Sequence, residues 1–177
     1  MTEKDFLRPE LDSGSRKILR KNSKDTETSS VIKVLHMAPE QCFLKRFRKL
    51  NHDYITADLY SPIADVKADI TKLPFEDDSF DVVFCNHVLE HIPDDTKAMQ
   101  ELYRVMKKGG MGIFQIPQDL NRETTFEDDS ITDPKERAKI FGQYDHVRIY
   151  GRDYFDKLRS IGFTVDSFLP IISLPFF

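Results

Sequence analysis

The chain has few cysteines and no long apolar run. Cys42 and Cys85 are its two cysteines, and neither forms a CxxC pair or lies in a cluster of metal-ligating residues. We therefore expect two buried, reduced thiols in a cytoplasmic protein, with no metal site. No stretch approaches the roughly 18 apolar residues of a membrane span, and the charged N-terminus lacks the apolar core of an export signal. The sequence thus predicts neither membrane insertion nor secretion.

Positive charge is also limited. The chain has 26 Lys and Arg residues against 30 Asp and Glu residues, which gives a formal net charge of -4 at pH 7. Such a chain lacks the broad positive field that concentrates a protein on nucleic acid or anionic membrane. Basic clusters at 16–21 and 45–49 contain no interleaved stacking aromatics, and we interpret them as solvated faces. We expect no nucleic-acid or membrane partner.

The length predicts one domain. A chain of 177 residues is long enough to bury roughly two-thirds of the surface that it exposes when unfolded. Residues 1–30 mix charged and small polar residues with little periodicity, so we expect a flexible N-terminal arm or a loosely docked helix. The remainder, 31–177, reads as a single domain without repeats or linkers.

From Val31 onward, short β-rich runs alternate with helical patterns. A helical stripe after Pro93 is expected to end at Gly109 and Gly110 as left-handed caps. Because such alternation favours parallel strands with right-handed crossovers, the predicted fold class is α/β, a doubly wound, mostly parallel sheet. The predicted strands are Val31–His36, Asp53–Leu59, Asp65–Ile70, Val82–Cys85, Met111–Ile116 and Phe163–Leu169, and two further helices are Gln41–Leu50 and Arg152–Ile161.

In sheets of this kind, ligands bind outside the carboxyl ends of the strands. The first strand ends in "HMAPE", where a nucleotide-binding turn usually has glycines and this one has none. Asp58 lies 58 - 38 = 20 residues after Ala38, the spacing of a carboxylate that holds the hydroxyls of a nucleoside ribose. Alternatively, Asp58 caps the loop that follows it.

Four segments, in this order and spacing, resemble class I S-adenosylmethionine-dependent methyltransferases of the small-molecule type: "VLHMAPE", "ITADL", "ADITKLPFEDDSFDVVFCNHVLEHIPD" and "ELYRVMKKGGMGIFQIP". The resemblance runs from about Val31 to Phe168, and a subgroup with LHxAPE in place of the glycine turn and a later HVRxYG is most similar. It implies a Rossmann-like fold. Members generally finish with a two-stranded hairpin, but only "PIISLPFF" follows "FTVDSFL", so we expect the C-terminal hairpin to be shortened or absent.

The resemblance also implies a cofactor, S-adenosylmethionine, and residues that contact it. The turn would wrap the methionine moiety, the second strand would end at the ribose, the third at the adenine, and the fourth would border the sulfonium and the acceptor. In that order, the implied residues are His36, Met37, Ala38, Pro39 and Glu40; Asp58 and Leu59; Asp69 and Ile70; and Asn86 and His87.

The turn itself departs from the family pattern. Pro39 fixes its φ near about -65°, so we predict a path that avoids the positive φ available to glycine. Ala38 is then the smallest substitute for a close backbone approach, and Glu40 could pair with the amino group or the sulfonium of the cofactor. We expect a functional, reshaped site.

Methyl transfer from a sulfonium is an in-line displacement that needs alignment of the reactants and no metal. A general base is needed only if the acceptor must lose a proton, and His87, His146 and Tyr144 are the candidates. We interpret His91 as structural. The long stretch 118–150, with a predicted helix at 133–141, could be a lid or acceptor wall, or a surface strand and turn. As a wall, its Arg148 would favour an acceptor with a carboxylate or phosphate.

The leading hypothesis is a methyltransferase acting on a small-molecule acceptor. The alternative is a non-catalytic domain that binds S-adenosylmethionine, or nothing, and works through protein contacts. A nicotinamide-dependent oxidoreductase ranks last, because Pro39-Glu40 would repel a pyrophosphate. Phe176 and Phe177, if exposed, would favour a homodimer.

Overall fold

The computed structural model describes residues 31–50 and 53–166. The expected N-terminal arm, the C-terminal hairpin and the two phenylalanines expected at a dimer interface lie outside the described residues.

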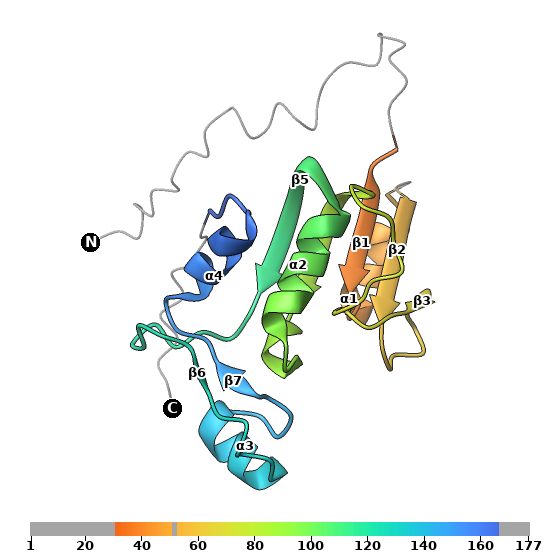
Figure 1. The fold of residues 1–177 in the computed structure, drawn as a ribbon. Coiled ribbons are helices and arrows are strands. Elements are labelled where there is room, and N and C mark those ends of the chain that lie inside the picture. Colours follow the sequence, from red (N-terminus) through yellow and green to blue (C-terminus); the bar gives the residue numbers. More distant parts are fainter. Residues whose placement is uncertain (1–30, 51–52, 167–177) are drawn as a thin grey trace, which may run out of the picture. The chain divides into compact units, whose positions relative to one another are not determined.

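A parallel sheet forms the centre of the described region, with strand order β3-β2-β1-β4-β5. The first four strands lie within or close to the predicted β-rich runs, which confirms the α/β fold class (Figure 1). The third is shorter than predicted, since only two of its residues pair in the sheet. The strands are β1 Lys33–Met37, β2 Asp53–Asp58, β3 Val66–Lys67, β4 Phe80–Asn86 and β5 Met106–Gln115.

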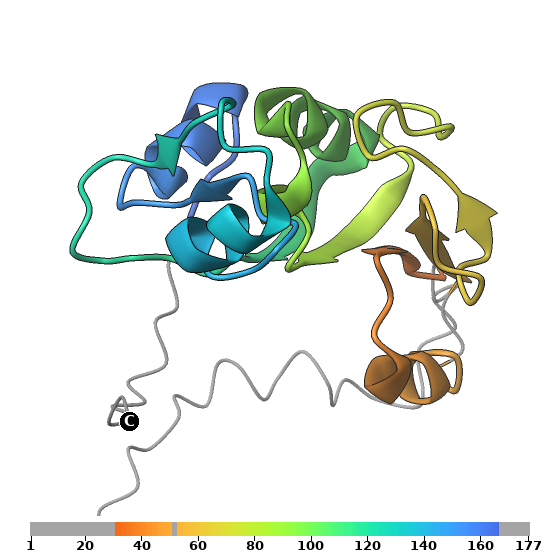
Figure 2. The same cartoon turned by 90° about the horizontal axis from the view of Figure 1, so that it is seen from below.

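Helices cover both faces of the sheet, as a doubly wound fold requires. α2 (Asp95–Val105) and α4 (Tyr154–Ile161) lie on one face and α1 (Gln41–Phe47) lies on the other (Figure 2). The face under α2 and α4 holds the main hydrophobic core, which includes Leu35, Met37, Val83, Cys85, Ala98, Met99, Leu102 and Leu158. Within the described ranges, every helix is too short or too polar to cross a lipid bilayer.

The Gly109-Gly110 pair does not cap a helix, contrary to the sequence prediction. α2 ends at Val105, and the next residue, Met106, is already extended at φ -83° and ψ 132°. Phe80 of β4 pairs with Met106 but Val82 pairs with Met111, so residues 107–110 bulge out of β5. Gly109 has φ +76° in this bulge, and a Cβ on Gly110 would lie 2.8 Å from a backbone oxygen. The glycines shape a strand bulge because pairing with β4 outweighs continuation of the helix.

Two other predictions are wrong in the described region. Residues 163–166 form no strand after α4. Cys42 is exposed on α1, whereas Cys85 is buried as expected and burial raises the pKa of its thiol. The exposed thiol follows from the amphipathic character of α1, whose buried residue is Leu44.

The excursion after β5 has structure of its own. It contains β6 (Phe126–Glu127), α3 (Pro134–Phe141) and β7 (Arg148–Ile149), with β6 and β7 paired antiparallel. α3 confirms the helix predicted at 133–141. It begins after Asp133, whose side chain caps it by accepting hydrogen bonds from the amides of the first turn. In Figure 1 these elements lie beyond the end toward which the sheet arrows point, which is the edge where a ligand is expected.

Candidate functional site

The carboxyl ends of three strands lie level with one another. Met37, the last residue of β1, pairs with Ala57 of β2 and with Cys85 of β4. The residues that follow, Ala38, Asp58 and Asn86, therefore meet at one edge of the sheet. The Ala38 amide donates to the Ala57 carbonyl at 2.9 Å, which ties the turn after β1 to the end of β2.

The turn after β1 uses the backbone conformation that glycine normally takes. Ala38 has φ +46°, in the left-handed region. The prediction that the turn avoids positive φ is wrong: Pro39 fixes only its own φ, and Ala38 takes the positive value although a residue before proline usually prefers an extended conformation. A left-handed residue with a Cβ costs about 1–2 kcal/mol, so the absence of glycine is a penalty in stability and does not change the type of turn.

Glu40 is held by protein groups at this edge. Its Oε2 lies 2.5 Å from His36 Nε2, and its Oε1 accepts from Asn86 Nδ2 at 3.4 Å. His36 Nδ1 lies 2.6 Å from the Tyr54 hydroxyl. A carboxylate accepts only, so Nε2 of His36 carries the proton and Nδ1 accepts from Tyr54. Tyr54, His36 and Glu40 thus form one chain of hydrogen bonds that ends on the Glu40 carboxylate.

Burial determines the protonation of this chain. It lowers the pKa of His36, although the neighbouring Glu40 carboxylate acts in the opposite direction. Burial also raises the pKa of Tyr54 to about 12, so its hydroxyl remains a donor. His36 is therefore neutral near pH 7 and positions Glu40 without neutralising its charge.

The structure limits which of the five predicted turn residues can contact a ligand through side chains. His36, Met37 and Pro39 are buried, whereas Ala38 and Glu40 are partly exposed. Sequence reasoning could not separate these residues, because the direction of each side chain depends on the strand register.

Two aspartates at this edge each organise the loop that follows. Asp58 Oδ1 accepts from the amides of Tyr60 at 2.6 Å and Ser61 at 2.5 Å. This oxygen therefore caps the loop after β2, as the alternative interpretation of Asp58 predicted. Asp69 Oδ1 accepts from the amide and the hydroxyl of Thr71, both at 2.8 Å, and these bonds lower the pKa of Asp69. Both carboxylates are thereby oriented by the loops that follow them.

The other residues implied at these ends differ in access. Ile70 packs its side chain in the core, so a ligand could reach only its backbone, and Leu59 is half-buried. Asn86 Oδ1 is buried and, among the described residues, has no hydrogen-bond partner. His87 has φ +53°, and its side chain is 63% exposed. The amide and imidazole after β4 are thus available at the predicted edge.

The three predicted candidate bases do not form one constellation. His87 Nδ1 lies 3.4 Å from Glu90 Oε1, and His146 is buried with its Nδ1 3.1 Å from the Phe141 carbonyl. Tyr144 is exposed, and within the described residues no hydrogen bond or ion pair joins it to either histidine. Sequence reasoning missed Glu90, a buried carboxylate between the two histidines, whose only signal is its place in "VLEH" just after a strand.

Arg148 has a structural role, which corrects its interpretation as an acceptor-binding residue. The buried guanidinium donates to the carbonyls of Leu89, Ile92 and Pro93 at 3.0, 2.5 and 2.8 Å, and to Glu127 at 2.9 Å. These bonds hold the segment after β4 against β7, so the guanidinium of Arg148 binds groups of the protein itself.

A groove of about 1280 Å³ runs along β5 and α4. Of the predicted site residues only His87 lines it, beside Gln115 at the end of β5, Gln118 from the excursion after β5, and Tyr154 from α4. His87 therefore lies both at the edge described above and on this groove, which also extends to Asp77 and Lys107 at the other end of β5.

Comparison with known proteins identifies a family whose model matches this chain. The model of the family described as "Methyltransferase domain" matches residues 22–114, more than half of the chain. A 2-phytyl-1,4-naphtoquinone methyltransferase of Nostoc punctiforme is 30% identical over 122 residues, covering 62% of this chain and 53% of that protein.

Solved structures share the fold at low sequence identity. One is the 1,6-didemethyltoxoflavin-N1-methyltransferase of Burkholderia thailandensis with bound 1,6-didemethyltoxoflavin and S-adenosylhomocysteine, at TM-score 0.56 and 15% identity over 77% of this chain and 63% of that chain. Another is the [4+2]-cyclase SpnF, at TM-score 0.51 and 17% identity over 75% and 52%. The chain spans 14%, 18% and 53% of the lengths of the first three curated relatives that it matches.

Proposed function

Because the chain belongs to the methyltransferase domain family of class I S-adenosylmethionine-dependent methyltransferases, we propose that it transfers a methyl group from S-adenosylmethionine to a small-molecule acceptor. The observation that carries the proposal is the level arrangement of the ends of β1, β2 and β4, which gathers polar groups at one edge.

The residues at this edge fit a cationic nucleoside. Glu40, Asp58 and Asp69 supply three carboxylates, which complement the positive charges of a sulfonium and an ammonium group. The orphaned Asn86 Oδ1 supports the fit independently, because a buried carbonyl oxygen without a donor costs about 1–3 kcal/mol unless a ligand donates to it.

Each residue has a part in holding the cofactor. Asp58 keeps its Oδ2 for the ribose hydroxyls while Oδ1 fixes the carboxylate on the loop. Asp69 and the Ile70 backbone receive the adenine, and Ala38 lets the chain approach the methionine moiety closely. Glu40, oriented by His36, attracts its cationic groups.

The bound cofactor supplies an electrophilic methyl group on a sulfonium, and the chain's own residues supply alignment. Holding two reactants in line contributes on the order of 7–11 kcal/mol. Where the acceptor loses a proton, His87 receives it at Nε2, since Nδ1 faces the Glu90 carboxylate. The exposure of His87 and its place on the groove favour it over the buried His146 and over Tyr144.

The acceptor is proposed as a small organic molecule. The Nostoc relative is named for a naphtoquinone substrate, and the groove beside His87 has room for a molecule of that class. The excursion 118–150 lies at the same end of the sheet and is proposed as the acceptor wall, with Gln118 on the groove side.

A thermal unfolding experiment tests cofactor binding. S-adenosylmethionine or S-adenosylhomocysteine at 100 times its dissociation constant should stabilise the protein by about 2.7 kcal/mol. Asp58→Asn keeps an oxygen for the Tyr60 and Ser61 amides but removes the charge, so it should lose most of this shift. Asp128→Asn is the matched control, because Asp128 caps Ser130 in the same way within the excursion. Cofactor binding is ruled out if the wild-type protein shows no shift.

Turnover is tested with cofactor labelled in its methyl group and a panel of quinol and phenol acceptors. Label in an acceptor, lost in His87→Asn at near-neutral pH, supports the proposal. Cofactor binding with no transfer to any acceptor supports the non-catalytic alternative instead.

A further inference from the structure

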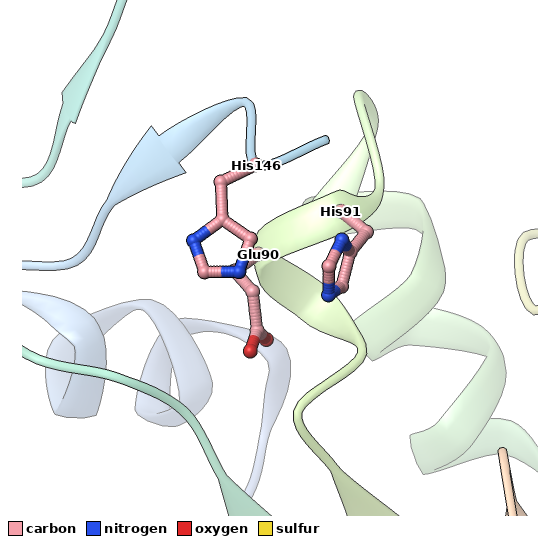
Figure 3. A group of neighbouring side chains, drawn as sticks. All are labelled: Glu90, His91 and His146. Carbon is pink, nitrogen blue, oxygen red and sulfur yellow. The ribbon is translucent and has the colours of Figure 1, made fainter. Parts of the chain in front are cut away.

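Two histidines and a glutamate gather beside the carboxyl end of β4, outside the set of residues proposed to hold the cofactor. Glu90 and His91 belong to η1, a short 3-10 helix spanning Leu89–His91, and His146 lies in the loop before β7 (Figure 3). One ligand atom from each residue lies within 4.8 Å of the other two. The tertiary fold thus brings together residues more than 50 positions apart in the sequence.

Glu90 makes this cluster unusual. Its side chain is 1% exposed, and its Oε2 has no hydrogen-bond partner in the part of the chain that the structure describes. A buried carboxylate oxygen without a partner is costly, and buried charges are normally paired or bound to metal. The lone pairs of Oε2 therefore indicate a missing positive partner.

Each histidine has its Nδ1 atom occupied by an outer acceptor. His146 Nδ1 lies 3.1 Å from the Phe141 carbonyl, and His91 Nδ1 lies 3.3 Å from Asp145 Oδ2. The Phe141 carbonyl only accepts, so Nδ1 of His146 carries the proton and its Nε2 presents a lone pair. The Asp145 carboxylate at ion-pair distance favours the same arrangement of the His91 ring. Metal-binding histidines typically donate their other N–H to a carboxylate or backbone carbonyl, which fixes the ring and its tautomer.

We propose that Glu90, His91 and His146 bind a divalent transition-metal ion such as Zn²⁺. Two imidazoles and one carboxylate suit zinc and its neighbours, whereas Mg²⁺ and Ca²⁺ prefer sites built from oxygen. His91 is 27% exposed, which gives the ion a route from solvent to the two buried ligands.

The ion would join two parts of the site that hydrogen bonds already bring together. The Val147 amide donates to the Glu90 carbonyl at 3.0 Å, so the loop before β7 is seated on η1. Three protein ligands leave one position of a tetrahedral ion open. The proposal does not depend on methyl transfer.

The test is titration of chelator-treated full-length protein with Zn²⁺, followed by calorimetry and thermal unfolding, and with Co²⁺, followed by visible absorption. All variants carry Cys42→Ser, because that exposed thiol would bind zinc by itself. One ion should bind per chain, raise the unfolding temperature, and give a cobalt spectrum of nitrogen and oxygen ligands.

Three substitutions separate a metal site from a structural cluster. Asp145→Ala, which removes the carboxylate that faces His91 Nδ1, should weaken binding about 10–100-fold, and His91→Asn should weaken it further. His87→Asn makes the same chemical change on the neighbouring exposed histidine and should leave affinity within a few fold. Glu90→Gln, of nearly equal size, should abolish the cobalt spectrum while the protein stays folded.

Two results would overturn the proposal. One is the absence of any shift or spectrum with Zn²⁺, Co²⁺ and Mn²⁺ in the parent protein. The other is binding that His91→Asn and His87→Asn reduce equally, which would place the ion elsewhere.

Discussion

Ala38→Gly should stabilise the protein, because Ala38 occupies a left-handed conformation at the end of β1. Removing the Cβ relieves about 1–2 kcal/mol of steric cost. The added conformational freedom of glycine in the unfolded chain destabilises the folded state by about 0.4–1 kcal/mol. The net gain is about 0.5–1 kcal/mol, which corresponds to an increase in unfolding temperature of about 1–4 °C for a domain of this size.

The assay is urea unfolding followed by circular dichroism, with the thermal midpoint as a second measure. Ala57→Gly is the matched control, because Ala57 is the hydrogen-bond partner of Ala38, is fully buried in β2 and does not have a positive φ. This control should lose about 1 kcal/mol, since glycine inside a strand is unfavourable. A decrease for Ala38→Gly as large as that of the control would refute the left-handed turn. The gain should persist without ligand, because it is a property of the backbone.

Two further predictions concern buried charges. The folded-state pKa of His36 lies below its ordinary value of 6.5, so the free energy of unfolding should fall as the pH drops from about 6.5 through that lowered value. In urea-unfolding measurements at a series of pH values, His36→Gln should weaken this dependence on pH. Arg148→Met should cost about 3–5 kcal/mol in the free energy of unfolding, because it leaves buried carbonyls without donors. Arg159→Met, on the solvent-facing side of α4, should change it by no more than about 0.5 kcal/mol. Equal losses from the two arginine substitutions would contradict the structural role of Arg148.

Much of the fold could be predicted from the sequence, because the central strands β1 and β4 contain short apolar runs that are largely buried. Val82–Cys85 and Asp53–Asp58 lie in strands, and the caps at Asp133 and Gly162 mark helix ends. The polar residues at the strand ends were also identifiable, since parallel strands align their carboxyl ends and Asp58 is the last residue of β2. These features depend on local patterns of two to four residues.

The Gly109-Gly110 bulge shows where local patterns stop being sufficient. A glycine pair after an amphipathic stripe is typical of a helix cap, yet pairing of Met106 with Phe80 starts β5 five residues before the predicted start at Met111. The competing strand is distant in the sequence, so its effect is not visible in the helix pattern.

The chemistry of the site was decided by tertiary structure. Only the strand register turns His36 inward to hold Glu40, and only the packing of the loop before β7 on η1 brings His146 to Glu90 and buries Arg148. The sequence by itself determined which residue types stand at the carboxyl edge of the sheet. The fold decided which of them face a ligand and which hold the others in place, because burial and hydrogen-bond partners come from segments far apart in the chain.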